Sequence, residues 1–372
     1  MLILLLACSN DKVSPETMAE ISSTYADIVY ESYTDSVTTA QRLNDTISSF
    51  LLSPTEVGLE DARNSWLASR EPYLQTEVYR FYDGPIDNPD SGVEGLLNAW
   101  PLDESYIDYT VDDASSGIIN DSSITIDSET LMSLNEQGGE ENIATGYHAI
   151  EYLLWGQDLS SETAGTRPYT DYIGDGSGTA LNHDRRSSYL ETTSNLLVEH
   201  LEEVQDAWAP DSNNFRSEFL SKSPEEQLRM IMTGMIILTG FETGGERLQT
   251  ALDSGDQEDE HSCFSDNTHR DMIQDIQGVQ NVYLGQYGSV SGLGIKDAIA
   301  EIDAELSERI ESEIQISLTA GNNLQVPFDN EISMTNAEGR DRVQDLIVSL
   351  RTLEQSLEEA FRAFGLAVPV AE

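Results

Sequence analysis

The chain has 372 residues, enough for two domains or for one large domain with a buried core. It carries 68 Asp and Glu against 19 Lys and Arg, so its formal net charge is -49 at pH 7. A surface this negative repels phosphate backbones, which argues against nucleic acid as a partner. The same charge attracts cations, and it also suits a protein that must stay soluble in high salt. The saline habitat is the simpler explanation, and a role in handling cations is compatible with it.

The N-terminal segment resembles a bacterial lipobox. The apolar run Leu2–Ala7 ends in a small residue, and Cys8 follows directly. Two departures are the missing basic residues before the run and the large side chain of Leu6. We expect residues 1–15 to be a signal and lipobox remnant with a linker, with a frayed apolar terminus as the alternative. Lipidation at Cys8 would make the protein an exported outer-membrane lipoprotein of the periplasm or cell surface, touching a membrane only through its anchor.

The second cysteine lies far from the first. Cys263 has no partner once Cys8 is lipidated, so a structural disulfide framework is excluded. No other stretch of the sequence is long and apolar enough to span a bilayer.

Helical periodicity dominates the first half of the chain. Apolar residues between positions 18 and 50 recur on one helix face. A second helix presents an inward-facing stripe at steps of four, three and four residues, formed by Trp66, Arg70, Tyr73 and Glu77. Residues 84–139 are rich in Gly, Ser, Asp and Pro, and we expect a long irregular connection there.

The second half is helical as well. After a helix that ends at Gly156, an irregular region extends to about residue 185. Further helices are expected at residues 187–208, from Ser223 through 238, at 297–318 and at 338–364. Runs of alternating strand residues are absent. The sequence therefore predicts an all-α fold with two helical bundles, at residues 16–185 and 186–372.

A histidine and a glutamate three residues apart form the most informative feature of the chain. His148 and Glu151 leave the same face of a helix, where both side chains can meet one metal ion. The spacing alone is a weak indication, because His-x-x-Glu often forms only a hydrogen bond or ion pair. The pair adjoins an apolar stripe formed by Ile143, Tyr147, Ile150 and Leu154. A carboxylate beside such a stripe is shielded from water and needs a partner.

Three other groups contain residue types that can bind metal, and the first two lie in the second half of the chain. Glu246 lies one turn after Glu242, and the two are either carboxylate ligands or solvated charges. His269 faces inward near the start of a helix in an acidic segment, and its alternative role is that of a hydrogen-bonded core histidine. The acidic glycine-rich segment 174–178 lacks the ligand spacing of an EF-hand and is interpreted as a surface loop.

The types of candidate ligand limit which metals and which reactions are possible. Imidazole and carboxylates without a thiolate cluster suit iron, zinc or manganese. The zinc-peptidase motif His-Glu-x-x-His is missing, because Ala149 follows His148 and Tyr152 stands in place of the second histidine. The inverted motif His-x-x-Glu-His also fails at Tyr152. Hydrolysis would need a second imidazole ligand and a general base from elsewhere in the chain, so no catalytic residue is assigned.

Several segments together resemble the imelysin family, also described as insulin-cleaving metalloproteinase-like (peptidase M75-like). They are Trp66-x-x-x-Arg70 with Glu77, Arg80–Asp87, the Gly-x-His-x-x-Glu motif with its continuation in Gly146–Gly156, Gly245–Arg247 and Asp259–His269. The last two resemble the iron-regulated protein A branch of that family. The resemblance covers nearly the whole chain after residue 16.

This resemblance implies an exported, often lipid-anchored bacterial protein of two related helical bundles with a link to iron acquisition. Carried over residue by residue, the metal site comprises His148, Glu151 and Glu77, with Arg70 and Trp66 as neighbours and Glu246 and His269 as contributors from the second bundle. The implied cofactor is iron, with zinc as the alternative. The implied partners are an iron ion, an iron chelate or haem, together with iron-uptake proteins of the cell envelope.

Three functions remain open at this point. The first is an iron-binding lipoprotein of bacterial iron uptake. The second is a metal-dependent peptidase of the imelysin type. The third is an acidic adhesion or scaffold protein in which His148 and Glu151 form only a buried hydrogen bond.

Overall fold

The computed structural model describes residues 13–178 and 180–369. Its first half contains α1 (Pro15–Leu52), α2 (Glu56–Leu74), η1 (Glu77–Tyr79), α3 (Glu94–Leu97), α4 (Glu104–Ile107), α5 (Ser128–Leu134), α6 (Gly146–Trp155), η2 (Tyr169–Tyr172) and α7 (His183–Trp208). Its second half contains α8 (Phe215–Ser221), α9 (Pro224–Ile237), η3 (Leu238–Gln249), α10 (Thr250–Ser254), η4 (Gln257–Asp259), α11 (Thr268–Leu284), α12 (Ile295–Ile302), α13 (Ala304–Asn322), α14 (Phe328–Ile332) and α15 (Ala337–Ala363).

Strand structure in the described residues is limited to β1 (Gln286–Tyr287) and β2 (Val290–Ser291), which pair antiparallel. The predicted all-α fold is therefore confirmed. The predicted lipobox with Cys8 lies outside the described residues and stays a prediction.

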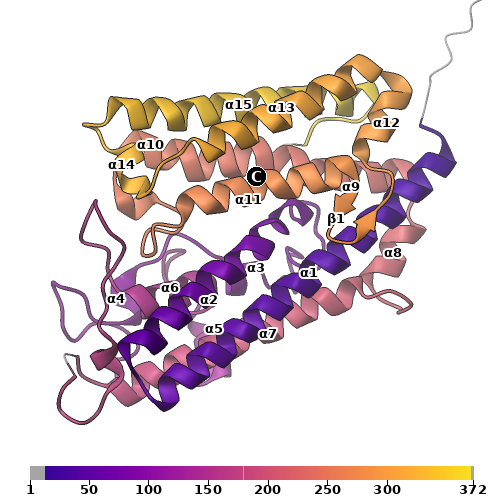
Figure 1. Cartoon of the computed structure of the whole chain (residues 1–372). Helices are drawn as coiled ribbons and strands as arrows, with labels where there is room; N and C mark the ends of the chain where they lie inside the picture. The colour runs from indigo at the N-terminus through magenta and orange to yellow at the C-terminus, as the bar shows by residue number, and fades with distance from the viewer. Residues whose placement is uncertain (1–12, 179, 370–372) are drawn as a thin grey trace, which may run out of the picture.

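Two groups of long helices form the molecule (Figure 1). In the first, α1 packs along α2 and α7, and α6 packs on α7. In the second, α15 packs along α13 and η3, and α13 packs on α11. Buried apolar side chains of both groups belong to one hydrophobic cluster. Helix α7 thus lies with α1, although the predicted boundary at residue 185 assigns most of it to the second bundle, and the exact division stays a prediction.

Two glycines bring the helix groups together around η1. A Cβ atom at Gly234 would lie 2.2 Å from the carbonyl oxygen of Val78, and one at Gly278 would lie 2.5 Å from that of Gln75. Any side chain at either position would push α9 or α11 away from the first group. These two contacts hold Glu77, which lies between Gln75 and Val78, against the second half of the chain.

The structure differs from the predicted helices at three places. Helix α2 ends at Leu74, so Glu77 lies in the following 3-10 turn rather than in the helix, although Arg70 and Glu77 are both buried as expected. The predicted helix 297–318 is divided between α12 and α13, because Asp303 accepts a hydrogen bond from the backbone of Leu306 and starts a new helix. The helix from Ser223 continues as the π-helix η3, which periodicity at 3.6 residues did not predict.

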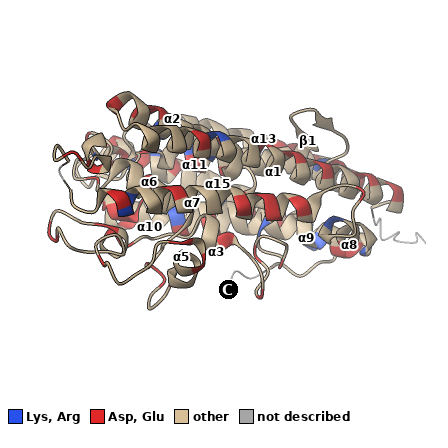
Figure 2. Cartoon of the chain, turned by 90° about the horizontal axis from the view of Figure 1, so that it is seen from below, with Lys and Arg blue, Asp and Glu red and all other residues tan. Residues whose placement is uncertain are grey.

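The exterior is strongly acidic. Figure 2 shows Asp and Glu spread over the helices and loops, with few Lys and Arg among them. Within the described part of the chain, no helix is both long enough and apolar enough to cross a membrane.

Candidate metal centre

The helix that carries the predicted pair is deeply buried. Every residue of α6 from Gly146 to Trp155 is buried. Gly146 starts the helix with a φ of 86°, and a Cβ atom there would lie 2.5 Å from the carbonyl oxygen of Leu97. The glycine of the Gly-x-His-x-x-Glu motif is therefore required by the backbone and by the packing against α3.

His148 and Glu151 meet on one face of α6, as their spacing predicts. The Nδ1 atom of His148 lies 2.9 Å from Oε2 of Glu151. The other oxygen, Oε1, accepts hydrogen bonds from the backbone N of Ser265 at 2.9 Å and from its Oγ at 2.6 Å. Burial raises the pKa of Glu151 to about 8, although the Ser265 hydrogen bonds act in the opposite direction. Glu151 therefore has both oxygens occupied, and it orients the imidazole.

A second histidine lies directly against the first. The rings of His148 and His261 are in edge contact, with centroids 4.9 Å apart and an angle of 74° between their planes. Nδ1 of His261 lies 2.7 Å from Oδ2 of Asp271, which repeats the histidine-carboxylate arrangement of the first pair. Residues 261 and 271 come from the loop before α11 and from its first turns. The centre is thus built by both halves of the chain.

Asp271 is the most heavily bonded carboxylate of this centre. Besides His261, it accepts hydrogen bonds from Arg70 at 3.0 Å, Ser262 at 2.6 Å and Asn267 at 3.0 Å. Burial acts to raise its pKa, but the guanidinium of Arg70 and the bond to His261 hold the pKa of Asp271 well below its usual range. Asp271 stays ionised and fixes the ring of His261.

Arg70 and Trp66 have supporting positions, as expected for neighbours of the site. The guanidinium of Arg70 lies 4.9 Å from the ring centroid of Tyr147 and 5.4 Å from that of Trp66. The indole nitrogen of Trp66 donates to the backbone oxygen of Tyr147 at 2.9 Å. The rings of Trp66 and Tyr147 thus hold the guanidinium of Arg70 in place, and Arg70 in turn donates a hydrogen bond to Asp271.

The two histidines fit a metal ion. Each uses Nδ1 toward a carboxylate, the arrangement by which proteins orient metal-binding imidazoles through Nε2. Nε2 of His148 is buried and has no hydrogen-bond partner. Burial and nearby positive charge lower the pKa of His148 well below its ordinary value and that of His261 to about 4, so both rings are neutral, as ligands must be.

A cavity of about 290 Å³ lies beside the two rings. Its walls include His261, Trp100, Arg80, Glu242 and Arg247. The ring of Trp100 is 5.0 Å from that of His148, which places His148 just behind the cavity wall. In the described part of the chain, no third His, Cys, Asp or Glu joins the two histidines in a compact group of three donors. An ion held by both imidazoles would therefore need further ligands, and the cavity lies beside His261.

Glu77 belongs to a neighbouring ionic network. Its Oε2 accepts hydrogen bonds from Arg80 at 2.7 Å and from Arg247 at 2.6 Å. Burial acts to raise its pKa, but these two guanidinium groups lower the pKa of Glu77 to about 2. Glu77 therefore positions two arginines of the cavity wall, and its predicted role as a metal ligand stays a prediction.

The two contributors expected from the second bundle lie in different places. Glu246 is exposed and lines the cavity. His269 is half-buried, and its Nδ1 lies 3.2 Å from the backbone oxygen of Asp266. It is not among the cavity-lining residues. Their roles as ligands also stay predictions.

The sequence alone does not distinguish His261, Asp271 or Arg247 from other polar residues as members of this site. His261 lies in a loop, where no periodicity indicates which way a side chain faces. The only indication for His261 is its place in the acidic segment before α11. In that segment His269 is the predicted ligand, because it lies on the inward-facing stripe of a helix. Asp271 lies in the same acidic segment, and only its buried contact with Arg70 reveals its role.

Comparisons with known proteins agree with this architecture. The sequence profile of the imelysin family matches residues 29–357. The chain belongs to the imelysin family. A curated relative, iron-regulated protein A of Synechococcus elongatus, is 24% identical over 268 residues, which cover 70% of this chain and 62% of that protein. The match therefore spans less than two thirds of the relative's length.

Two solved structures share the fold of this imelysin. One, described as an iron-regulated protein A precursor from Parabacteroides distasonis, has a TM-score of 0.69 and 18% identity and covers 94% of this chain and 97% of that one. The other, an imelysin-like protein from Psychrobacter arcticum, has a TM-score of 0.69 and 12% identity and covers 96% and 99%. At these identities the likeness concerns the fold alone.

Proposed function

We propose that this imelysin is an exported protein that binds iron in bacterial iron acquisition, and that the iron is held by His148 and His261. The observation that carries the proposal is the buried, unpartnered Nε2 of His148 next to a second neutral imidazole. Each ring is oriented by its own carboxylate, Glu151 or Asp271. Neutral imidazoles suit iron and also zinc, and the relation to iron-regulated protein A favours iron.

The surroundings favour iron that arrives with its own ligand. Two imidazoles leave most coordination positions of an iron ion open toward the cavity. The cavity of about 290 Å³ is at the small end of the range for small-molecule sites. Arg80 and Arg247 in its wall offer guanidinium groups to an anionic chelator. A small anionic iron chelate therefore fits this site better than a bare ion, and haem is the larger alternative.

The cellular setting belongs to the same proposal. Lipidation at Cys8 would hold the protein at the outer membrane, in the periplasm or at the cell surface. From there it would pass iron to uptake proteins of the envelope. The strongly acidic surface is compatible with gathering cations near such a site.

The peptidase alternative has less support in the geometry. A metallopeptidase needs a general base that is free to activate a metal-bound water. Glu151 has both oxygens bonded, to His148 and to Ser265. Asp271 accepts from four side chains. Both carboxylates next to the imidazoles are thus used to hold other groups, which favours binding over hydrolysis.

The proposal is tested by titrating metal-free protein with ferric citrate, and in separate arms with ferrous sulfate and with haemin. We expect one iron per chain from ferric citrate, with affinity reduced by about 10- to 100-fold or more in His148→Ala and in His261→Ala. The matched control is His183→Ala, because His183 is on α7, half-buried and paired with Asp184 at 2.9 Å. Unchanged iron binding in both variants would overturn the assignment of the site.

A further inference from the structure

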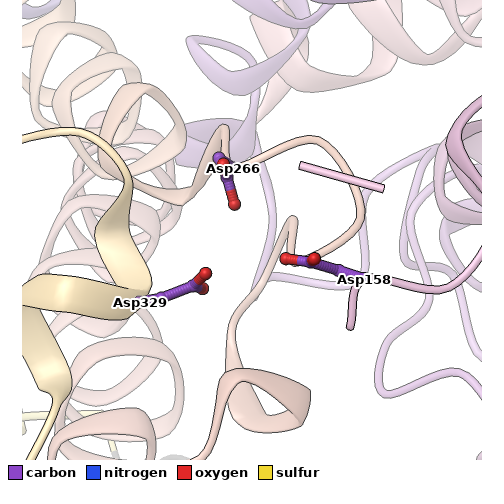
Figure 3. Close-up of side chains that lie close together, drawn as sticks. All are labelled: Asp158, Asp266 and Asp329. Atoms are coloured by element: carbon purple, nitrogen blue, oxygen red, sulfur yellow. The ribbon is translucent and has the colours of Figure 1, made fainter. Parts of the chain in front are cut away.

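Three aspartates from distant parts of the sequence converge at one point. Asp158 follows α6, Asp266 lies in the loop before α11, and Asp329 is in α14. Figure 3 shows their carboxylates pointing toward one another. One oxygen of each lies within 4.8 Å of the other two. We call these three residues the carboxylate cluster.

The cluster is buried, and two of its oxygens lack a hydrogen-bond partner. Asp158, Asp266 and Asp329 are 3%, 7% and 4% exposed. Oδ2 of Asp158 and Oδ1 of Asp266 have no hydrogen-bond partner. The oxygens of Asp329 are buried as well, and the side chain that adjoins them is the carboxyl group of Glu260. Buried polar atoms are almost always paired, so unpaired carboxylate oxygens in one place require an explanation.

The charged groups around the carboxylate cluster add repulsion between buried carboxylates. The charged groups that act on Asp266 are Asp329 and Asp158, and those that act on Asp158 are Asp329 and Glu104. Glu260, fully buried, adjoins Asp329, and burial together with that neighbour raises the pKa of Glu260 well above its ordinary value. Burial followed by these like charges raises the pKa of Asp158 and of Asp266 to about 7. The charged groups with the largest effect on Asp158 and Asp266 are thus all acidic.

We propose that the carboxylate cluster binds a hard divalent cation of the calcium class. The donors are oxygens only, which is the ligand set of Ca²⁺ rather than of a metal that prefers nitrogen or sulfur. Ca²⁺ binds oxygens at about 2.4 Å, so ligand atoms on opposite sides of one ion are about 4.8 Å apart. The spacing in the cluster, within 4.8 Å, meets this limit. Mg²⁺, with shorter bonds and a stricter geometry, fits such a set less well.

The surface offers the cation a way in. Asp158 also lines a shallow surface pocket together with Asp256 and Glu258. The remaining coordination positions of the ion can be filled there by water, as is usual at calcium sites.

The cation would join three segments that are far apart in the sequence. It links the loop after α6, the loop before α11 and the short helix α14. The middle segment also carries Ser265, which holds Glu151, and His261, which faces His148. The cation site is distinct from the imidazole pair and does not depend on iron binding. Its role is structural, because it fixes the loop that completes the other centre.

The test compares EDTA-treated, dialysed full-length protein with and without CaCl₂ at constant ionic strength, by isothermal titration calorimetry and thermal unfolding. We expect one Ca²⁺ per chain and a rise in Tm of about 5 °C or more at saturating Ca²⁺. A parallel arm uses MgCl₂, for which we expect weaker binding and a smaller rise. No saturable Ca²⁺ binding, or equal protection by Mg²⁺, overturns the proposal.

Two variants locate the site. Asp158→Asn with Asp329→Asn should abolish the Ca²⁺ binding and the rise in Tm while the protein remains folded in EDTA. Asp341→Asn, an exposed position on α15, makes the same kind of charge change outside the cluster and should leave both unchanged. Ca²⁺ binding that survives in the double variant, or that is lost equally in Asp341→Asn, contradicts the assignment. A double variant that does not fold is replaced by Asp266→Asn, judged by the same calorimetric readout.

Discussion

The imidazole pair of His148 and His261 and the carboxylate cluster both include a residue of the loop before α11, and their buried carboxylates have opposite surroundings. At the pair, Asp271 is surrounded by Arg70 and three further donors. At the cluster, both oxygens of Asp329 are buried, and the side chain that adjoins them is another buried acid, Glu260. A buried carboxylate with its own cation is a fixed structural element, whereas a group of buried carboxylates without one is an incomplete site. The difference indicates that the protein's own charges already complete the surroundings of Asp271, whereas the carboxylate cluster depends on a cation from solution.

The largest expected effect is the loss of the central charge at the imidazole pair. Asp271→Ala leaves Arg70 buried without its ion-pair partner, so we expect the free energy of unfolding to fall by about 3–5 kcal/mol. Urea unfolding in EDTA measures this. The exposed control Asp341→Ala should change stability by less than about 0.5 kcal/mol. A loss at Asp271 no larger than that of the control would mean that the pair is not held as described.

The two centres should also differ in their pH dependence. Asp158 and Asp266 have pKa values of about 7 in the folded protein, so the folded state binds more protons than the unfolded state above pH 4. Stability in EDTA should therefore fall as pH rises from 5 to 7, by at most about 1.4 kcal/mol per pH unit for each proton, and by less where solvent screens the charge. Asp271, with its lowered pKa, contributes stability that is present above pH 4 and is lost as pH falls further.

Urea unfolding between pH 5 and 8 measures this slope. Saturating Ca²⁺ should flatten it, because the bound cation favours the ionised carboxylates. Asp158→Asn with Asp266→Asn should make it less steep in EDTA, and the part that remains includes Glu151, whose pKa burial raises to about 8. An identical slope in the wild type and in this variant would show that other groups carry the pH dependence.

Removing one charge from the carboxylate cluster should raise the free energy of unfolding in EDTA, whereas Asp271→Ala lowers it. Asp329→Asn relieves repulsion among buried acids, so we expect an increase of about 1 kcal/mol in the free energy of unfolding in EDTA. In Ca²⁺ the variant should be less stable than the wild type. A variant that is destabilised equally in both conditions would remove the contrast between the two centres.

The smallest expected effect concerns the residue that joins the two centres. Ser265→Ala removes the hydroxyl bond to Glu151 but keeps the backbone N–H bond. We expect a loss of about 1 kcal/mol in stability and a few-fold loss of iron affinity. Ser133→Ala, an exposed serine on α5, is the control. No change in either quantity would mean that the backbone bond alone orients Glu151.

The sequence predicted the features that depend on local helical periodicity. The all-α fold followed from helical stripes, and the meeting of His148 and Glu151 followed from their spacing of three. The contact between His261 and Asp271 was not predictable in this way, because it depends on how a loop folds back on the start of α11. The carboxylate cluster was less accessible still, since residues 158, 266 and 329 are brought together only by tertiary packing. In an acidic chain of this kind, three more aspartates carry no indication of burial.

X-ray absorption at the iron edge of protein loaded with ferric citrate, with excess Ca²⁺ to fill the carboxylate cluster, tests the proposed iron site most directly. We expect nitrogen ligands from two imidazoles, completed by oxygen from the chelator. That signature should disappear in His148→Ala with His261→Ala and persist in Asp158→Asn with Asp329→Asn. An iron environment made only of oxygen that is lost in the aspartate variant and retained in the histidine variant would contradict the account.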